Sequence, residues 1–177
     1  MHPPLRLLIL AGLLSLLGSE LRAAESAAQT GKTNAEPKLV QPTPDGTVLL
    51  HARDVAIHGT TVRYEPQTNK NTIGYWTKVS DWVSWDFQVS QAGSYEVEIL
   101  QGCGKGSGGS EVAFGVGEQT LLVTVQDTGG FQNFVPRNIG KLTFDKPGRY
   151  VFAVKPKTKP GVAVMDLRSV TLKPTAN

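Results

Sequence analysis

The sequence is poor in the residues that most often crosslink or catalyse, with one cysteine, Cys103, and three histidines in 177 residues. A single cysteine excludes an intramolecular disulfide, so the fold must rest on its buried core. Only His51 and His58 lie beyond the N-terminal segment, and neither has a sequence neighbour typical of a nucleophile–base pair or a metal-ligand cluster. We therefore expect both to be structural or surface residues.

The chain also lacks an apolar run long enough to cross a membrane as a helix, which needs about 20 residues. The longest run, LLILAGLLSLLG at residues 7–18, follows a positively charged start and precedes a small-residue cleavage site. This order is typical of a secretory signal peptide, which we assign to residues 1–23. Residues 24–46 are polar, contain proline and predict a flexible linker. We expect a secreted or periplasmic protein without membrane contact after cleavage.

Net charge is low, at +3, and indicates no nucleic-acid partner. Its distribution is uneven, because residues 81–129 contain seven acids and one base, whereas residues 130–177 contain nine bases and two acids. One interpretation is two solvated surfaces of opposite sign. The other is a basic edge around KPKTKPG (155–161) that meets an anionic partner, such as a sulfated glycan.

A sustained 3.6-residue period is absent, and period-two alternation takes its place. In VSWDFQV (83–89) the apolar residues share one face and the polar residues share the other. The same alternation recurs, with Gly- and Pro-containing turns between the runs, at residues 95–100, 111–117, 120–126, 138–144, 149–156 and 164–172. We predict that residues 47–174 form an all-β domain, a β-sandwich of the jelly-roll type. The first strand, LLHARDVAI (49–57), and the last, VMDLRSVTLKP (164–174), would close the sandwich and bring the ends of the domain together.

The glycine-rich stretch LQGCGKGSGG (100–109) admits three interpretations: a phosphate loop, a reactive thiol or a turn. A phosphate loop is excluded because Gly106 follows the lysine and a strand pattern follows the loop. Cys103 lacks an activating neighbour other than Lys105. We predict a connection between two strands, with Cys103 as a small buried residue at a strand end.

The sequence predicts no catalytic residue, and therefore no enzyme. Four of the acids fall on the solvent-facing positions of predicted strands, where a carboxylate favours solubility and does not indicate glycoside hydrolysis. They are Asp86, Glu96, Glu98 and Glu111. The sequence around the single cysteine also differs from the C-x-P/A-x-R pattern that sulfatases need.

Aromatic residues gather in two predicted loops, GYWTKVSDW (74–82) and TGGFQNF (128–134). A flat ring beside polar groups is suited to a sugar, whose C–H face stacks on the ring while its hydroxyls bond to the rim. The alternative is that these rings cap the ends of the core. The predicted ligand-binding residues are Tyr75, Trp76, Trp82, Phe131, Asn133, Phe134 and Arg137.

Five segments, taken in order, resemble the motifs of carbohydrate-binding modules of families 6 and 35 over about residues 47–174. They are SDWVSW, AGSYEV, FGVGEQ, DTGGFQNF and VMDLRSVTL. The chain also resembles a little-characterised relative of these modules, found alone or appended to secreted planctomycete-type bacterial sulfatases and fucosidases. The resemblance implies a galactose-binding-like jelly roll that attaches to a polysaccharide, plain or sulfated. It also implies a separate secreted hydrolase or sulfatase as a partner.

Residue by residue, the resemblance places Phe131 and Phe134 in the families' first aromatic loop and Tyr75 or Trp76 in the second. Val164 stands where the families have a sugar-binding asparagine, and Asp166 matches their aspartate. The first strand reads His51-Ala52-Arg53 where the families have the calcium-binding E-A-E pattern, so the sequence predicts no cofactor and no structural calcium.

Two other functions stay open from the sequence. The same sandwich can serve as an extracytoplasmic scaffold that docks another protein, in which case the aromatic residues belong to the core. A sulfatase- or glycosidase-associated enzymatic activity is the third interpretation, and the missing cysteine pattern argues against it.

Overall fold

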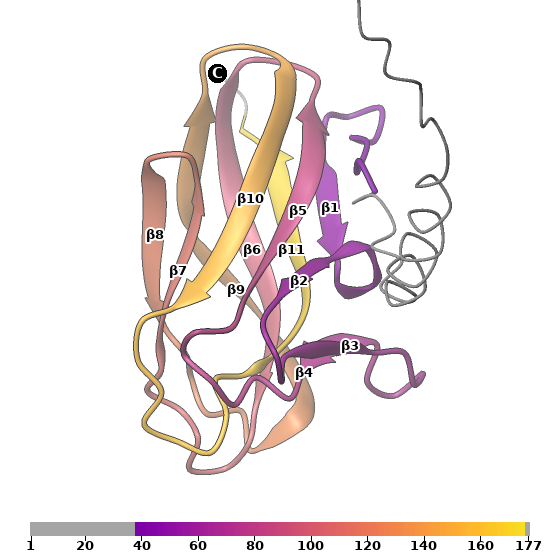
Figure 1. Ribbon diagram of the computed structural model, residues 1–177. Helices are drawn as coiled ribbons and strands as arrows, with labels where there is room; N and C mark the ends of the chain where they lie inside the picture. The colour runs from indigo at the N-terminus through magenta and orange to yellow at the C-terminus, as the bar shows by residue number, and fades with distance from the viewer. Residues whose placement is uncertain (1–37, 176–177) are drawn as a thin grey trace, which may run out of the picture. The chain divides into compact units, whose positions relative to one another are not determined.

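A computed structural model describes residues 38–175, so the predicted signal peptide and residues 24–37 of the predicted linker lie outside the described part. Eleven strands and one short 3₁₀ helix, η1, make up the domain (Figure 1). Their bounds are β1 Val48–His51, η1 Ala52–Asp54, β2 Ala56–His58, β3 Arg63–Glu65, β4 Thr72–Gly74, β5 Trp82–Val89, β6 Gly93–Cys103, β7 Glu111–Val116, β8 Gln119–Thr124, β9 Gly130–Phe144, β10 Gly148–Pro156 and β11 Asp166–Pro174. Within residues 38–175, no helix is long and apolar enough to cross a membrane.

The strands form two antiparallel sheets packed face to face, which confirms the predicted all-β sandwich. One sheet has the order β3-β4-β11-β6-β9, with β1 also paired to β11, and the other has the order β2-β5-β10-β7-β8. The pairing of β1 with β11, in which Val48 lies opposite Leu172, confirms that the first and last strands close the sandwich together. Between β1 and β2 the chain turns through η1 and changes sheet, so the predicted first strand is in fact two strands.

The core lies between the inner faces that the alternation predicted. Trp85 and Phe87 of β5 are fully enclosed, and Phe87 contacts Phe144 of β9 across the core. Phe144 packs edge-on against both Tyr95 and Phe87, with ring centroids 5.2 and 5.9 Å apart. Such aromatic contacts bury large apolar areas, which lets the domain fold without a disulfide.

The first described residues pack against the sandwich. Val40, inside the segment predicted as a linker, forms a parallel bridge with Phe87 and is 8% exposed. Its amide donates to the Asp86 carbonyl and its carbonyl accepts from the Gln88 amide, each at 2.9 Å. An apolar residue and two main-chain bonds therefore attach this part of the chain to the edge of β5, ahead of Thr47.

The TGGFQNF segment, predicted as a loop, belongs instead to the start of the long strand β9. Its pairing with β6 is irregular, because Gln101 lies opposite Val135 while Cys103 lies opposite Gly130. Residues 131–134 thus have only Gly102 across from them and bulge out of the ladder. The two aromatic residues of the segment are presented by this bulge rather than by a free loop, and we call residues 131–134 the β9 bulge.

Candidate functional site

A pocket of about 290 Å³ opens at the end of the sandwich where the connections after β4 and before β11 meet the β9 bulge. We call it the loop-end pocket. Its lining combines aromatic, apolar and charged residues from segments that are far apart in the sequence. They are Glu65, Lys70, Tyr75, Thr77, Phe131, Gln132, Val162, Ala163 and Asp166. Of the seven residues predicted to bind a ligand, the structure brings Tyr75 and Phe131 together in this pocket.

Tyr75 forms one wall and is 49% exposed. Its backbone is left-handed, at φ 53°, a conformation that a bulky residue adopts only when its surroundings impose it. The Arg63 guanidinium lies 3.5 Å from the ring centroid and holds the ring in place. The Val164 amide donates to the Trp76 carbonyl at 2.8 Å, so the wall after β4 is tied to the wall before β11. Strain kept at an exposed aromatic residue is typical of a functional position.

Phe131 forms the opposite wall, and the glycine-rich stretch 102–109 makes room for it. A Cβ on Gly102 would overlap the Phe131 carbonyl oxygen, and a Cβ on Gly104 would overlap the Phe131 ring. Glycine at both positions lets the backbone of one connection approach the β9 bulge closely. The stretch is therefore a connection between strands, as predicted, and it also supports a pocket wall.

We expect Gly104→Ala to displace the Phe131 ring without unfolding the domain, because the overlap is with the edge of a half-buried side chain. The matched control is Gly106→Ala, which meets nothing within 4 Å and tests only the left-handed backbone at φ 76°. Near-ultraviolet circular dichroism and the chemical shifts of the Phe131 ring report the displacement. An unshifted ring in Gly104→Ala would contradict the contact.

Two carboxylates, Glu65 and Asp166, lie at the inner end of the loop-end pocket and are 7% and 4% exposed. The Glu65 Oε1 accepts from the Lys70 Nζ at 2.7 Å. Burial, and then the charge of Glu65, raises the pKa of Asp166 to about 7. Asp166 was predicted only as a match to the families' motif, and Glu65 was not predicted at all. No signal in the sequence marks Glu65, since its partner comes from a distant strand.

Three of the predicted aromatic residues lie outside the pocket, and two of these are tryptophans. Trp76 is completely buried and its Nε1 donates to the Asp81 carbonyl at 2.8 Å, so the prediction that it contacts a ligand is wrong. Its neighbour Tyr75 faces outward, and Trp76 therefore faces the core. Trp82 lies at the start of β5 on the other sheet, stacked on His58 at 3.6 Å and under the Lys155 ammonium.

The remaining predicted residues, Asn133, Phe134 and Arg137, make contacts next to the pocket. The Asn133 amide donates to the Thr128 carbonyl at 3.2 Å and closes the turn into β9. Phe134 lies under the Arg168 guanidinium, 3.6 Å from its ring centroid. Arg137 donates to the Gln101 side chain at 2.7 Å and to the Thr124 carbonyl at 3.0 Å. None of the three lines the loop-end pocket.

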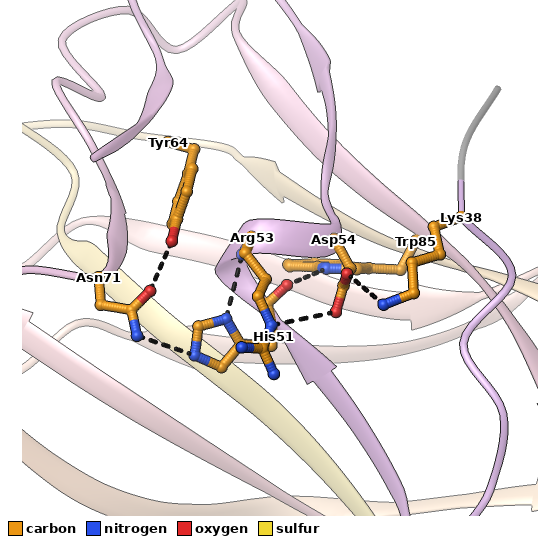
Figure 2. Close-up of polar contacts among 7 residues, drawn as sticks. All are labelled: Lys38, His51, Arg53, Asp54, Tyr64, Asn71 and Trp85. Atoms are coloured by element: carbon orange, nitrogen blue, oxygen red, sulfur yellow. Dashed lines mark hydrogen bonds and ion pairs between the residues drawn. The ribbon is translucent and has the colours of Figure 1, made fainter. Parts of the chain in front are cut away.

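The region of the families' calcium site does not fit a calcium ion (Figure 2). His51 Nδ1 accepts from the Arg53 amide at 3.1 Å, and the Arg53 guanidinium points at Asp54. Asp54 also pairs with Lys38 at 2.9 Å, so its charge is already neutralised. Calcium needs six to eight oxygen ligands, whereas this region offers imidazole and guanidinium groups. Residues 38–175 contain no group of three or more His, Cys, Asp or Glu residues placed to hold a metal.

Cys103 ends β6 and is fully buried, as predicted. Burial, followed by the charges of Asp127 and Asp166, raises the pKa of its thiol to about 11, so the group is inert near neutral pH. The lysines of the predicted basic edge, Lys155 to Lys159, do not line the loop-end pocket.

His58 was predicted to be a structural or surface residue, and its Nε2 lies 2.8 Å from the Ser84 Oγ. Burial, and then the charge of Lys155, lowers the pKa of His58. Among the described residues no carboxylate hydrogen-bonds to its other ring nitrogen. The pair thus lacks the third group that orients a histidine for nucleophilic catalysis.

Solved structures with the same fold include carbohydrate-binding modules. A family 35 module from Clostridium thermocellum superposes with a TM-score of 0.61 at 15% identity, over 73% of this chain and 98% of that one. The CBM6cm-2 module of Cellvibrio mixtus lichenase 5A, solved with cellotriose, gives 0.57 at 19% identity, over 72% and 97%. A GH26-CBM35 β-(1,4)-mannanase from Podospora anserina gives 0.57 at 18% identity over 75% of this chain, which spans 28% of the length of the mannanase chain.

The fold is therefore that of the family 6 and 35 carbohydrate-binding modules, as the sequence motifs indicated. The chain belongs to the family described as "Domain of unknown function (DUF5077)", which matches residues 56–177. The sequence matches no curated protein.

Proposed function

We propose that this domain is a non-catalytic sugar-binding module, exported from the cytoplasm, which takes a sugar residue of a glycan into the loop-end pocket. The observation that carries the proposal is the pocket itself: an exposed Tyr75 and a half-buried Phe131 form its walls beside polar groups of Gln132 and Thr77. Aromatic walls with a few polar groups are the usual chemistry of a sugar site.

The walls and the polar groups have separate tasks in this proposal. The rings of Tyr75 and Phe131 contact the C–H face of a sugar and release water from it. Gln132 and Thr77 bond to hydroxyls at the rim and select their orientation. The pocket volume of about 290 Å³ suits one sugar residue, with the rest of the glycan extending over the exposed side chain of Val162.

A module of this kind raises the local concentration of a partner enzyme at its polymer and catalyses no reaction itself. We propose that it retains a separate secreted hydrolase or sulfatase near a polysaccharide, by binding the polymer weakly at each site. Support for the non-catalytic role comes from His58, which forms no oriented triad, and from the binding-module fold.

Replacing Tyr75 with alanine should weaken glycan binding at least about tenfold, or about 1.4 kcal/mol, because the stacking surface is lost. Phe131→Ala should have a similar effect. The measurement is a glycan array followed by calorimetric titration with an oligosaccharide that binds the wild type. Both variants keep the core of the sandwich, so thermal unfolding should remain cooperative.

The matched control is Leu122→Ala on β8, an apolar side chain that is 63% exposed and lies on the other sheet. It should bind like the wild type. Absence of binding to every glycan tested would overturn the proposal and favour the scaffold function. Turnover of a plain or sulfated glycan by the pure protein would overturn the non-catalytic role.

A further inference from the structure

The two carboxylates of the loop-end pocket turn toward the same point. β4 lies between β3 and β11, Glu65 is the last residue of β3, and Asp166 is the first residue of β11. Gly74 ends β4 between them. A Cβ on Gly74 would overlap the Glu65 Oε2 and would lie 3.1 Å from the Asp166 Oδ1. The glycine thus leaves space into which one oxygen of each carboxylate projects.

Hydrogen bonds leave those two oxygens free. The Glu65 Oε1 accepts from Lys70, and the Asp166 Oδ2 faces the Gln132 Nε2 at 3.5 Å, the outer limit of a hydrogen bond. Arg168 does not pair with Asp166, because its guanidinium donates to main-chain carbonyls and stacks on a ring. Among residues 38–175, the structure provides no donor to the Glu65 Oε2 or to the Asp166 Oδ1. In this same part of the chain, only the Ser110 Oγ is a fully buried side-chain polar atom without a partner, so these two oxygens are open to the pocket. A ligand with N–H donors can therefore reach both of them.

We infer that the Glu65 Oε2 and the Asp166 Oδ1 together bind the protonated primary amine of an amino sugar; this inference rests on the proposed function. An ammonium group has three N–H donors and a positive charge, so one group can donate to both oxygens and neutralise the carboxylate that Lys70 leaves unpaired. A neutral hydroxyl donates one proton and satisfies one oxygen. A calcium ion needs six to eight oxygens, and two carboxylates fall short of that number. The pocket therefore selects sugars with a free amine over their N-acetylated forms.

In the free protein the pKa of Asp166, raised to about 7, leaves the carboxyl largely protonated at pH 6. Asp166 is surrounded by Glu65, Lys70, Arg168 and the thiol of Cys103. Burial and the charge of Glu65 raise the pKa of Asp166 above its ordinary value, despite the opposite effects of Lys70 and Arg168. Near neutral pH, arrival of an ammonium group favours the ionised carboxylate, so binding expels the proton of Asp166 to solvent.

The experiment compares the glucosamine trisaccharide with its N-acetylated counterpart by calorimetric titration. The wild type should bind the free-amine form at least about tenfold more tightly, as charged hydrogen bonds of this kind typically allow. Asp166→Asn should reduce that ratio to within about threefold, and Glu65→Gln should reduce it as well. Glu118→Gln, an exposed acid in the turn between β7 and β8, is the matched control and should keep the ratio.

A second measurement uses only the wild-type protein. At about pH 6, titrations in buffers of different ionisation enthalpy should show net release of protons when the free-amine trisaccharide binds, and none when the N-acetylated form binds. Equal affinity for the two trisaccharides, no proton release, or an unchanged ratio in Asp166→Asn would overturn the inference. Tyr75-dependent binding of neutral sugars alone would overturn the amine preference and leave the sugar-binding proposal standing, whereas binding of no glycan would overturn both. If calcium chloride displaces the free-amine trisaccharide from the wild type but not from Asp166→Asn, the two carboxylates bind a metal ion instead of an amine.

Discussion

Replacing Trp76 with alanine should destabilise the domain by about 3–5 kcal/mol, the usual cost of removing a fully buried aromatic side chain. Trp76 has no exposed surface, and its indole N–H satisfies the buried Asp81 carbonyl. Domains of this size have a free energy of unfolding of about 5–15 kcal/mol, so the variant should be marginally folded or unfolded at room temperature. Denaturant unfolding, followed by circular dichroism, measures the effect.

The control for this prediction is Trp76→Phe. Phenylalanine keeps most of the buried apolar surface but has no N–H, so the Asp81 carbonyl loses its donor at a cost of about 1–3 kcal/mol. An intermediate stability is therefore expected. Wild-type stability in Trp76→Ala would contradict the buried position and restore Trp76 as a ligand contact.

Removal of the Asp81 carboxylate should have the second-largest effect, about 3 kcal/mol in Asp81→Ala. One oxygen, Oδ2, accepts from the Thr61 amide and hydroxyl, each at 2.8 Å, and from the Val62 amide at 3.0 Å. Asp81 is 2% exposed, so alanine would leave these donors without a partner. The connection into β3 would lose its attachment to the connection that carries Tyr75. Asp81→Asn keeps the shape and one acceptor oxygen, and it should cost less.

The pH dependence of stability separates the contribution of the ionised Asp81 carboxylate from that of side-chain packing. Burial alone would raise the pKa of Asp81, but the main-chain and side-chain donors outweigh it and lower the pKa from 3.8 to about 2. A carboxylate with a lowered pKa stabilises the fold above its unfolded value, and the stabilisation is lost as pH falls through the folded value. The difference in unfolding free energy between wild type and Asp81→Asn should therefore shrink between about pH 4 and pH 2. A difference that is constant over this interval would contradict an ionised role for Asp81.

The alternation of apolar and polar residues predicted the sandwich well, because it reports which face of each strand is buried. VSWDFQV became β5 with Trp85 and Phe87 in the core, and the closing strands paired as expected. The acids on wet faces also behave as predicted, since Glu96 and Glu98 lie 3.8 and 3.7 Å from lysines of neighbouring strands. These features depend on the local sequence and on burial alone.

The loop-end pocket was predictable only in part. The aromatic content of two segments indicated Tyr75 and Phe131, but no local pattern separates Tyr75 from the buried Trp76, since the left-handed turn at Tyr75 decides which ring faces outward. Glu65 and Asp166 meet because β4 places their strands on either side of it. Such a juxtaposition is a property of sheet order and cannot be read from either segment.

The β9 bulge has a consequence for how ligand preference can change. The pairs Gln101–Val135 and Cys103–Gly130 fix the register of β9 on either side of residues 131–134. Substitution of a ring in the bulge, or insertion of one residue there, alters the pocket wall while these pairs and the core beneath them stay in place. We therefore expect changes confined to residues 131–134 to alter the pocket wall without altering the fold.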